Sequence, residues 1–347
     1  MNEGDASTGR RPGKVTLQDV ADEAGVHPST VSRALDPDRN GRVKESTREL
    51  VVEVARRLGY RPDMVARGLQ SGRTGTVGVV VADLGNTFVT PLLHGVAAAI
   101  ETSHMLSVVA ESQDDHDRLA GILDHLLSRR VDGMIVLAAR TGDQQALEEV
   151  NRSVPVVLAS RPLEDTPLCQ VTHDNERGGR LVAEHLQALG HRRVAQLEGP
   201  SDVLNFPRRA LGFRSVVSAH GLAEIEVPGR ADRPSLEEGR RLMGLLLETS
   251  PEVPTAVFAH NDLMALGALA VLRERGVRVP DDISLVGYND MPLVAHVAPP
   301  LSTVRYDSFA VGRWAGERLL GTIRGEGCDD VVLDPVLVPR GSSRRIG

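Results

Sequence analysis

The chain has 347 residues, of which 41% are apolar and 25% are charged, and its formal net charge is −7. This composition is typical of a soluble globular protein and excludes collagen-like, intrinsically disordered and disulfide-scaffold proteins. No apolar stretch approaches the ~20 residues of a membrane-spanning helix, and the polar N-terminal segment does not resemble a secretory signal. Because Cys169 and Cys328 lack the spacing of metal ligands, we expect a reduced, cytoplasmic protein without a membrane partner.

Three short helices are predicted after a polar tail at residues 1–14, which we expect to be disordered. Apolar residues recur at helical spacing over 17–24, and Gly25 is typical of a helix end. A second helix is predicted over 28–35, with a proline at its first position, and a third over 45–58. The three helices indicate a small domain over about 15–61.

The first two predicted helices, joined by a glycine turn, have the geometry of a DNA-reading helix-turn-helix. Off the buried face of the second helix lie Pro28, Ser29, Thr30, Ser32 and Arg33. Arginine can bind guanine with two hydrogen bonds, and short hydroxyls can reach base edges or phosphates. An ordinary three-helix bundle with a solvated face is the alternative that the spacing leaves open.

Residues 62–75 are predicted to be a linker or a helix that forms only under some conditions. Glycine and proline residues flank a stretch that is too short to stay helical by itself in water. Gly68 within it lowers its helix propensity further.

From residue 76 onward, short apolar runs alternate with helical stretches, which predicts parallel sheets covered by helices on both faces. The predicted strands are 77–82, 106–110, 134–138, 156–160, 194–198, 256–259, 284–288 and a last strand over 331–338. These are too many strands for one sheet of ordinary size. We therefore expect two α/β subdomains, the first reaching to about residue 173.

Ligands of such sheets bind beyond the carboxyl ends of the strands, and this rule selects a candidate pocket. The polar and aromatic residues at these ends are Asp83, Asn86, Phe88, Ser160, Arg161, Asp174, Asn205, Arg209, Asn261, Asp262, Asn289 and Asp290. His173, His260 and His296 are further candidates. For Asp262 and Asp290, a role in capping the following segment is the alternative.

No motif of an enzyme stands out in the sequence. The chain lacks the nucleophile elbow, the phosphate-binding loop, the zinc-protease motif and the complete dinucleotide fingerprint. We therefore expect no catalytic residues, no metal and no nucleotide cofactor, and the protein is predicted not to be an enzyme.

A set of segments in a fixed order resembles the LacI/GalR family of transcriptional regulators. It begins with VTLQDVADEAGVHPSTVSRAL and RVKESTRELVVEVARRLGYRPDMVARGLQSGRTGTVGVVVADLGN. It continues with RRVDGMIV, VPVVLASRPL, DNERGGRLVAEHLQALGHRRVA, PTAVFAHNDLMALGAL, RVPDDISLVGYND and PPLSTVR. The resemblance covers about residues 14–340.

The resemblance implies a small all-α helix-turn-helix domain and a core like that of periplasmic binding proteins, with two Rossmann-like subdomains. The core is expected over 76–345. Its N-terminal subdomain would hold about 76–173 and 305–333, and its C-terminal subdomain about 174–304 and 334–345. The family also implies a homodimer on palindromic operator DNA. No leucine heptad follows the last strand, so a dimer is expected rather than a tetramer.

The resemblance further assigns DNA contacts. Pro28, Ser29 and Arg33 match base-reading positions, and Leu69 matches a hinge leucine that inserts between central base steps. The whole expected set is Thr16, Pro28, Ser29, Thr30, Ser32, Arg33, Ala66, Leu69 and Gln70. Because the hinge is too short to hold a helix alone, DNA and the partner chain are expected to order it together.

In the core, the resemblance implies an effector between the two subdomains. Arg209 matches a ligand-binding arginine, and Phe88 matches an aromatic residue that stacks on a sugar or base. The expected ligand-binding set is Asn86, Phe88, Arg161, Asn205, Arg209, Asn261, Asp262 and Asn289.

The chain departs from the family pattern at several positions. His27 and Lys44 stand where serine is common, and each change is expected to remove an N-cap that contributes ~1 kcal/mol. In the pocket, Asn289 and Ser160 stand where aspartate is common, and Thr87 replaces a proline. The loss of two carboxylates leaves a modified, acidic or larger ligand open.

We therefore expect a cytoplasmic, homodimeric repressor of a carbohydrate-catabolic operon, controlled by a sugar or sugar derivative. An activator, a regulator of a nucleobase or other metabolite pathway, and a solute-binding protein that does not bind DNA are the alternatives. The sequence names neither the effector nor the operator.

Overall fold

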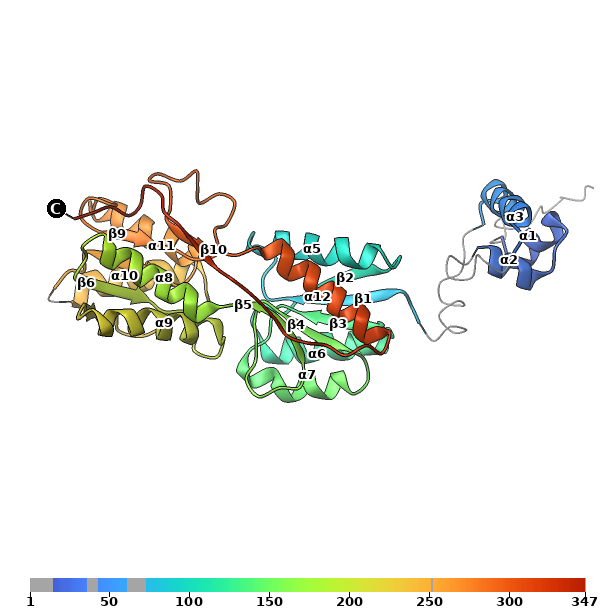
Figure 1. Ribbon diagram of the computed structural model, residues 1–347, viewed down its shortest axis with the longest axis horizontal. Helices are drawn as coiled ribbons and strands as arrows, with labels where there is room; N and C mark the ends of the chain where they lie inside the picture. Colours follow the sequence, from blue (N-terminus) through green and yellow to red (C-terminus); the bar gives the residue numbers. More distant parts are fainter. Residues whose placement is uncertain (1–14, 36–42, 61–72, 251, 347) are drawn as a thin grey trace, which may run out of the picture. The chain divides into compact units, whose positions relative to one another are not determined.

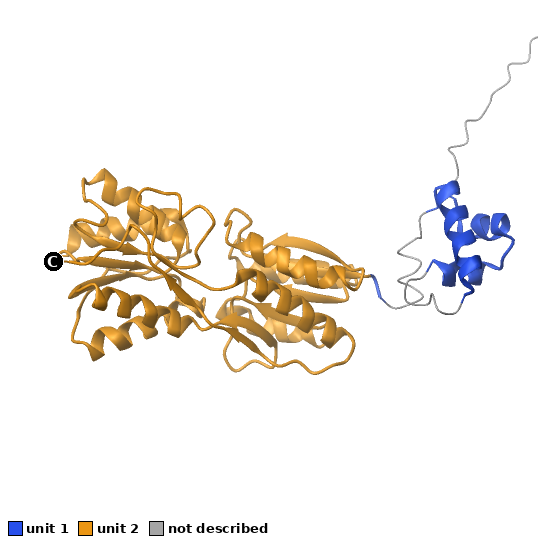
Figure 2. Cartoon of the chain, turned by 45° about the horizontal axis from the view of Figure 1, so that its top comes forward, with its two compact units in different colours: residues 1–74 blue, residues 75–347 orange. Residues whose placement is uncertain are grey.

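The computed structural model describes residues 15–35, 43–60, 73–250 and 252–346. The chain divides into two compact units, residues 1–74 and residues 75–347 (Figure 2). The predicted hinge residues Ala66, Leu69 and Gln70 lie outside the described residues.

The described residues of the first unit form a bundle of three helices, as the sequence predicts. The helices are α1 (Leu17–Ala24), α2 (Pro28–Ala34) and α3 (Glu45–Leu58). Val20, Val31 and Val51 are fully buried in a core that all three helices share. The apolar spacing that predicts these helices is therefore also the spacing that builds their common core.

The turn between α1 and α2 follows from local chemistry. The Thr16 side chain accepts a hydrogen bond from the Asp19 amide, and the Asp19 carboxylate accepts one from the Thr16 amide. This capping box satisfies two free amides at the start of α1. Gly25 ends α1 with φ of 65°, a left-handed conformation that glycine adopts without steric cost.

The expectation that α2 lacks an N-cap is wrong. His27 Nδ1 accepts a hydrogen bond from the Ser29 amide at 3.2 Å, so a ring nitrogen does the work of the missing hydroxyl. Lys44, in contrast, makes no side-chain cap for α3, as expected.

The second unit contains a six-stranded parallel sheet, to which we refer with its helices as the six-stranded subdomain (Figure 1). In spatial order its strands are β11 (Val331–Leu333), β5 (Cys169–His173), β4 (Val156–Ala159), β3 (Gly133–Val136), β1 (Thr76–Val81) and β2 (Leu106–Glu111). Its helices are α5 (Val89–Glu101), α6 (His116–Ser128), α7 (Gln144–Asn151), α12 (Ser308–Ile323) and the short η2 (Thr141–Asp143).

The four-stranded subdomain is built on a second parallel sheet (Figure 1). Its strands in order are β7 (Ala223–Ile225), β6 (Arg193–Leu197), β8 (Ala256–Ala259) and β9 (Ser284–Val286). Its helices are α8 (Asn175–Ala188), α9 (Asn205–Ala219), α10 (Leu236–Thr249) and α11 (Asp262–Glu274). The α/β fold with two parallel-sheet subdomains, predicted from the sequence, is confirmed.

The chain passes between the two subdomains three times. The connections are β5 to α8, β10 (Thr303–Arg305) to α12, and β11 to β12 (Val336–Val338). β10 and β12 pair antiparallel with each other. The predicted single strand over 331–338 is therefore wrong, because Asp334 and Pro335 separate two strands that belong to different sheets.

The expectation of free cysteines is also wrong. Cys169 and Cys328 form a disulfide, with 5.8 Å between their Cα atoms. The reason is the parallel pairing of β11 with β5, which brings Val331 beside Val171. A separation of 159 residues in the sequence hides this proximity.

Helices α8 and α9 approach each other closely because each has a glycine at the contact. A Cβ on Gly179 would collide with the backbone of Arg209, and a Cβ on Gly212 would collide with the backbone of Glu176. The close contact holds the backbone of Arg209 against α8 and so places its side chain.

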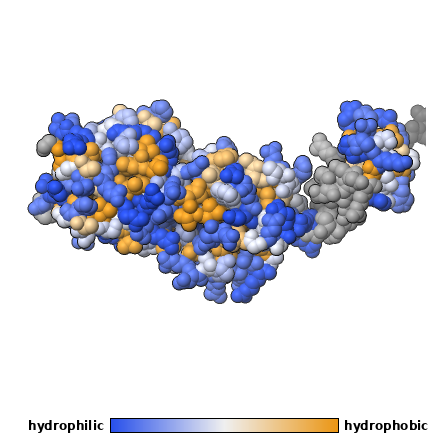
Figure 3. Space-filling model, in the orientation of Figure 1, coloured by the Kyte–Doolittle hydropathy of each residue, from blue (hydrophilic) through white to orange (hydrophobic). Residues whose placement is uncertain are grey.

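The surface of the core is mixed in character. On the face shown in Figure 3, apolar areas are broken up by hydrophilic side chains. No helix within the described ranges has the length and apolar character needed to cross a membrane.

Candidate functional site

The exposed face of α2 carries most of the predicted DNA-contacting residues. Ser29, Ser32 and Arg33 are exposed, and Pro28 and Thr30 are half-buried. These side chains point away from the bundle core, so the face is open to a partner.

Arg33 is held in a defined direction on this face. Its Nε donates to the Ser29 carbonyl at 3.0 Å, and its second terminal nitrogen donates to Ser29 Oγ at 3.1 Å. Ser29 Oγ in turn lies 2.8 Å from His27 Nδ1. A guanidinium fixed in this way keeps donors free at the tip of a short helix, which suits a guanine edge or a phosphate.

Thr16 has a structural task. Its hydroxyl and amide are both engaged with Asp19 in the capping box of α1. The predicted hinge contacts of the DNA-binding set, at 66, 69 and 70, fall on residues that are not described.

A cavity of about 450 Å³ lies between the two subdomains, at the carboxyl ends of their strands. Seven of the eight predicted ligand-binding residues line it, namely Asn86, Phe88, Arg161, Asn205, Arg209, Asn261 and Asn289. The rule that selected strand ends therefore brought together side chains from distant segments.

Arg209 is buried at the base of this cavity. Its Nε donates to Asn175 Oδ1 at 2.9 Å, and another nitrogen donates to the carbonyl of His260. Its guanidinium carbon lies 3.6 Å from the centre of the Tyr288 ring. Burial lowers the pKa of Arg209, yet guanidinium stays charged at neutral pH. The partners named here are neutral, so its charge is available to oxygen atoms of a ligand.

Two amide oxygens beside Arg209 have no partner among the described residues. Asn205 and Asn289 are both at least nine-tenths buried, and each leaves Oδ1 without a hydrogen bond. The nitrogen of the Asn205 amide donates to the Ser160 carbonyl at 2.9 Å, and this bond fixes the orientation of Asn205 Oδ1. Buried polar atoms are nearly always satisfied, so these acceptors point to a ligand with hydroxyl or N–H donors.

Phe88 and Tyr306 supply apolar surface to the same cavity. Their rings pack edge to face, with centroids 5.9 Å apart. Aromatic rings of this kind pack against the C–H groups of a sugar ring or against the face of a base.

Asn261 contacts the cavity but is already committed elsewhere. Its Oδ1 caps α11 by accepting from the Met264 amide, and its Nδ2 donates to the Pro234 carbonyl, both at 2.8 Å. It therefore holds the loop of Pro234 in place, beside Arg233 and Glu237 of the cavity wall.

Asp262 does not line the cavity, which corrects its place in the predicted set. It is fully buried and accepts hydrogen bonds from the Met291 amide at 2.8 Å and from Thr303 Oγ1 at 2.7 Å. Burial raises the pKa of this carboxyl to about 7. Because these contacts tie α11 to the segment after β9 and to the start of β10, the role of Asp262 is structural.

Asp174 and Asp290 are likewise engaged in structure. Asp174 caps α8 by accepting from the Arg177 amide at 2.8 Å. Asp290 forms an ion pair with Arg340 at 2.6 Å. Asp174 therefore caps a helix, Asp290 forms an ion pair, and neither residue lines the cavity.

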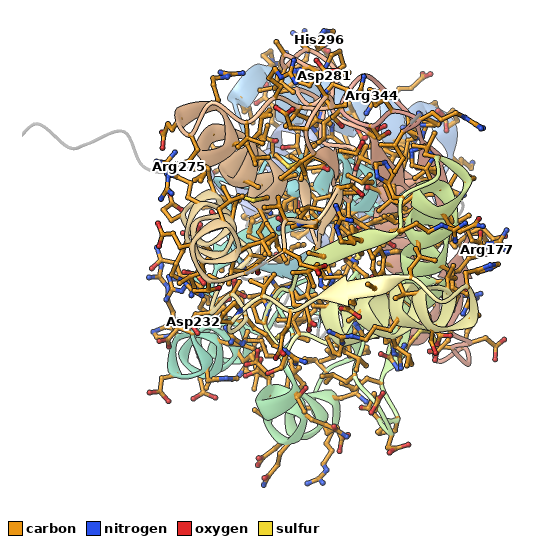
Figure 4. All side chains as sticks on the ribbon, turned by 90° about the vertical axis from the view of Figure 1, so that its left-hand side faces the viewer. Arg177, Asp232, Arg275, Asp281, His296 and Arg344 are labelled. Carbon is orange, nitrogen blue, oxygen red and sulfur yellow. A yellow bond between two sulfur atoms is a disulfide. The ribbon has the colours of Figure 1, made fainter. Side chains whose placement is uncertain are left out.

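The three histidines lie in different settings. Burial, and next the charge of Arg209, lower the pKa of His173 and of His260 well below the ordinary value, so both rings are neutral. His173 stacks on Tyr306 with 3.5 Å between ring centroids, directly behind the cavity. His296 is exposed at the edge of the four-stranded subdomain, away from this cluster (Figure 4).

Several cavity residues were missed by the sequence analysis, notably Glu111 at the end of β2 and Gln113 and Asp114 in the turn that follows. The signal was available, because 106–110 was predicted as a strand and its carboxyl end is this turn. Burial opposes ionisation of Asp114, but Arg161 outweighs it and lowers the pKa of this carboxyl. Arg233 comes from the loop before α10 and Glu237 from the first turn of α10, and no pattern in the sequence predicts that they reach the cavity.

Comparison with known proteins gives the same architecture. Residues 16–63 match the model of the bacterial regulatory proteins of the lacI family, and residues 183–343 match the periplasmic binding protein-like domain. The transcriptional regulator CelR of Thermobifida fusca is 36% identical over 347 residues, covering 96% of this chain and 98% of the relative. The chain belongs to the LacI family.

Other members of the LacI family support this assignment. The transcriptional repressor CytR of Escherichia coli K12 is 30% identical over 335 residues, covering 95% of this chain and 97% of CytR. A lac repressor dimer bound to operator and an anti-inducer has a TM-score of 0.82 at 29% identity, covering 96% of this chain and all of that one. A CelR–cellobiose complex has a TM-score of 0.70 at 34% identity, covering 94% and 99%. These relatives are transcription regulators.

Proposed function

We propose that this LacI-family chain is a cytoplasmic repressor of a carbohydrate-catabolic operon. The small helical unit binds palindromic operator DNA, and a sugar in the cavity of the core controls that binding. The observation that carries the proposal is the convergence of Arg209, Asn205 and Asn289 on one cavity. Their free donors and acceptors suit vicinal hydroxyls, which both donate and accept hydrogen bonds.

On the DNA side, the proposal gives Arg33 and Ser29 the main part in reading bases, with Pro28, Thr30 and Ser32 beside them. Proline has no side-chain donor, so its contribution is contact surface alone. Leu69 is the proposed wedge in the minor groove, flanked by Ala66 and Gln70, and Thr16 contacts the DNA backbone while it caps α1.

The protein acts as a homodimer in this proposal, since an operator with two-fold symmetry needs two reading helices. The edge strand β2 is a suitable surface for the second copy. Its side chains Leu106, Val108 and Val109 are 73%, 45% and 40% exposed. Long apolar edge strands are usually covered, and an identical edge covers them with matching hydrogen bonds.

The role of the cavity is binding and not catalysis. A sugar that binds one arrangement of the core more tightly than the other shifts the equilibrium between DNA-competent and DNA-incompetent arrangements of the dimer. The relatives named above are regulators, and CelR has been solved with cellobiose.

The test combines an unbiased DNA selection with a ligand screen on the full-length protein. Selection from random duplexes should enrich a palindrome, and a thermal-shift screen of cellobiose, lactose, ribose, uronates and nucleobases should give a sugar hit. A ligand at ~100 times its dissociation constant stabilises the native state by about 2.7 kcal/mol.

Arg209→Ala should abolish the thermal shift and the effect of the hit on DNA binding, while operator affinity without ligand is kept. The matched control is Arg208→Ala, which removes the neighbouring arginine on α9 that pairs with Glu164 outside the cavity. Enrichment of sequences without a palindrome would contradict the proposed operator. A hit only among nucleobases would contradict the proposed sugar effector.

A further inference from the structure

Besides the three connecting segments, the two subdomains are joined by a contact next to the cavity wall. Arg140 follows β3 of the six-stranded subdomain, and Asp202 follows β6 of the four-stranded subdomain. Two guanidinium nitrogens of Arg140 lie 2.7 and 2.6 Å from Asp202 Oδ2. The Thr141 amide also donates to the Asp202 carbonyl at 2.8 Å. Side chain and backbone therefore join the two subdomains at this point.

The same guanidinium also supports the wall of the cavity. The remaining terminal nitrogen of Arg140 donates to the Asp114 carbonyl at 2.7 Å. Asp114 and Gln113, which both line the cavity, have φ of 55° and 57°. Residues other than glycine adopt this left-handed conformation only where surrounding contacts hold them. Arg140 supplies one such contact, and the ion pair of Arg161 with Asp114 supplies another.

Arg140 is itself fixed in place. Its side chain is only 14% exposed, and its amide donates to Asp143 Oδ2 at 2.9 Å. His116 Nδ1 lies 2.5 Å from the other oxygen of Asp143, so this carboxylate is held from two sides. The five donors of a guanidinium lie in one plane, which lets one side chain serve Asp202 and Asp114 together.

Another ion pair across the same cleft offers a contrast. Arg208 and Glu164 also join the two subdomains, but they lie 3.5 Å apart and their side chains are 39% and 65% exposed. Exposed pairs of this kind contribute little to stability. Of these two ion pairs, that of Arg140 is therefore the stronger candidate to couple the cavity with the opposite subdomain, since its side chains are 14% and 35% exposed.

We propose that Arg140 is a positioning residue of the effector site. Without reaching into the cavity, it holds the Gln113–Asp114 wall in its binding shape and ties that wall to the opposite subdomain through Asp202. The inference rests on the proposed function in one respect, that the cavity is the effector site. An effector that contacts this wall then acts on the closure of the cleft through the contact of Arg140 with Asp202.

Residue-resolved hydrogen–deuterium exchange on the full-length protein without ligand tests the proposal. The Gln113 amide, bonded to the Ala82 carbonyl at 2.8 Å, and the Asp115 amide, bonded to the Ser112 carbonyl at 3.2 Å, report on the wall. The Thr141 amide reports on the cleft. The Asp174 amide, bonded to the Leu333 carbonyl at 3.0 Å, reports on the connecting segments.

Arg140→Ala should accelerate exchange about tenfold or more at the wall and cleft amides, because a partly buried, charge-assisted contact is lost. The Asp174 amide should keep its rate. Glu164→Gln is the matched control and should change none of these rates. Uniform acceleration, with Asp174 included, would overturn the proposal because it indicates general destabilisation. Unchanged exchange at the wall would overturn it as well.

Arg140→Lys separates positioning from bulk stability. A lysine ammonium can pair with Asp202 but lacks the planar fork that also serves the Asp114 carbonyl. We expect protection to return at the Thr141 amide while the Gln113 and Asp115 amides still exchange fast. Protection that returns at all three amides would overturn the claim that one guanidinium serves both Asp202 and the Asp114 carbonyl. Because no operator or sugar is used, failure here is distinct from failure of the proposed function.

Discussion

The helical unit and the core of this protein present their functional side chains in different ways. Ser29 and Arg33 lie one turn apart on a single helix, so local periodicity already places them on one exposed face. Asn205 and Arg209 lie one turn apart on α9, and Asn289 reaches the same cavity from the segment after β9. The first surface therefore depends on one short helix, and the second depends on the closure of the whole α/β core. We therefore expect changes in the core and changes in the helical unit to act independently of each other.

The largest effect is expected from the disulfide. Replacing Cys169 and Cys328 together with serine removes a link between residues 159 apart, which should destabilise the core by about 2–5 kcal/mol. Fluorescence of Trp314, the single tryptophan of the chain, measures unfolding of the core. The reduced wild-type protein is the control and should unfold like the variant.

The helical unit should be unaffected by this change, because it shares no part of the disulfide. Operator binding below the unfolding transition should therefore be the same for both proteins. A core midpoint that does not move on removal of the disulfide would contradict the prediction.

The second effect is a pH dependence that belongs to the core alone. Burial raises the pKa of Asp262 to about 7 from an ordinary 3.8, so the folded core binds this proton more tightly than the unfolded chain. Its contribution to stability is full at pH below 3.8 and is lost as pH rises through about 7. The loss is at most about 1.4 kcal/mol per pH unit.

Asp262→Asn should remove this part of the pH dependence. Unfolding free energies of variant and wild type, measured by Trp314 fluorescence between pH 5 and pH 8, should give a difference that moves in favour of the variant as pH rises. Parallel curves for the two proteins would show that Asp262 does not titrate in this range.

The third effect concerns the helical unit alone. Arg33→Ala should weaken operator binding by about 1–3 kcal/mol and relax sequence preference, because a two-pronged contact to a base is lost. Fluorescence anisotropy with the selected operator measures the change. Arg56→Ala is the control, since Arg56 pairs with Glu53 on α3 at 2.8 Å. An equal loss in both variants would mean that Arg33 contributes only charge.

The smallest effect is expected at the helix starts. Thr16→Ala should cost about 1 kcal/mol of stability in the helical unit, because the capping box is lost. Lys44→Ser should stabilise the same unit by a similar amount, since α3 has no side-chain cap. Amide exchange of α1 and α3 in the full chain measures both. Changes of the same sign would refute the capping argument.

Much of the fold was predictable because its signals are local. Each apolar run predicted as a strand upstream of residue 290 became a strand. The positions of the three helices in the first unit followed from apolar spacing and from Gly25. The break of the strand over 331–338 was missed, because apolar character alone does not tell which sheet a strand joins. Strand β5 was missed because Cys169, Gln170 and Thr172 interrupt its apolar pattern.

The candidate site was partly predictable for a topological reason. Parallel strands end at one edge of a sheet. Residues that follow separate strands, such as Asn86 and Asn289, therefore converge although they are far apart in the sequence. The rule fails for Asp262, which follows a strand but turns inward to Met291 and Thr303. It also fails for Arg233, whose loop position depends on packing.

Most helices and strands, the helix-turn-helix and the edge at which the cavity lies could be predicted from local sequence signals. Periodicity, caps and strand ends are local properties, and they act before the chain is folded. Tertiary structure alone decided the pairing of Cys169 with Cys328, the burial of Asp262 and the contact of Arg140 with Asp202. These depend on distances between segments far apart in the chain, and only the packing of two sheets around three connections sets such distances.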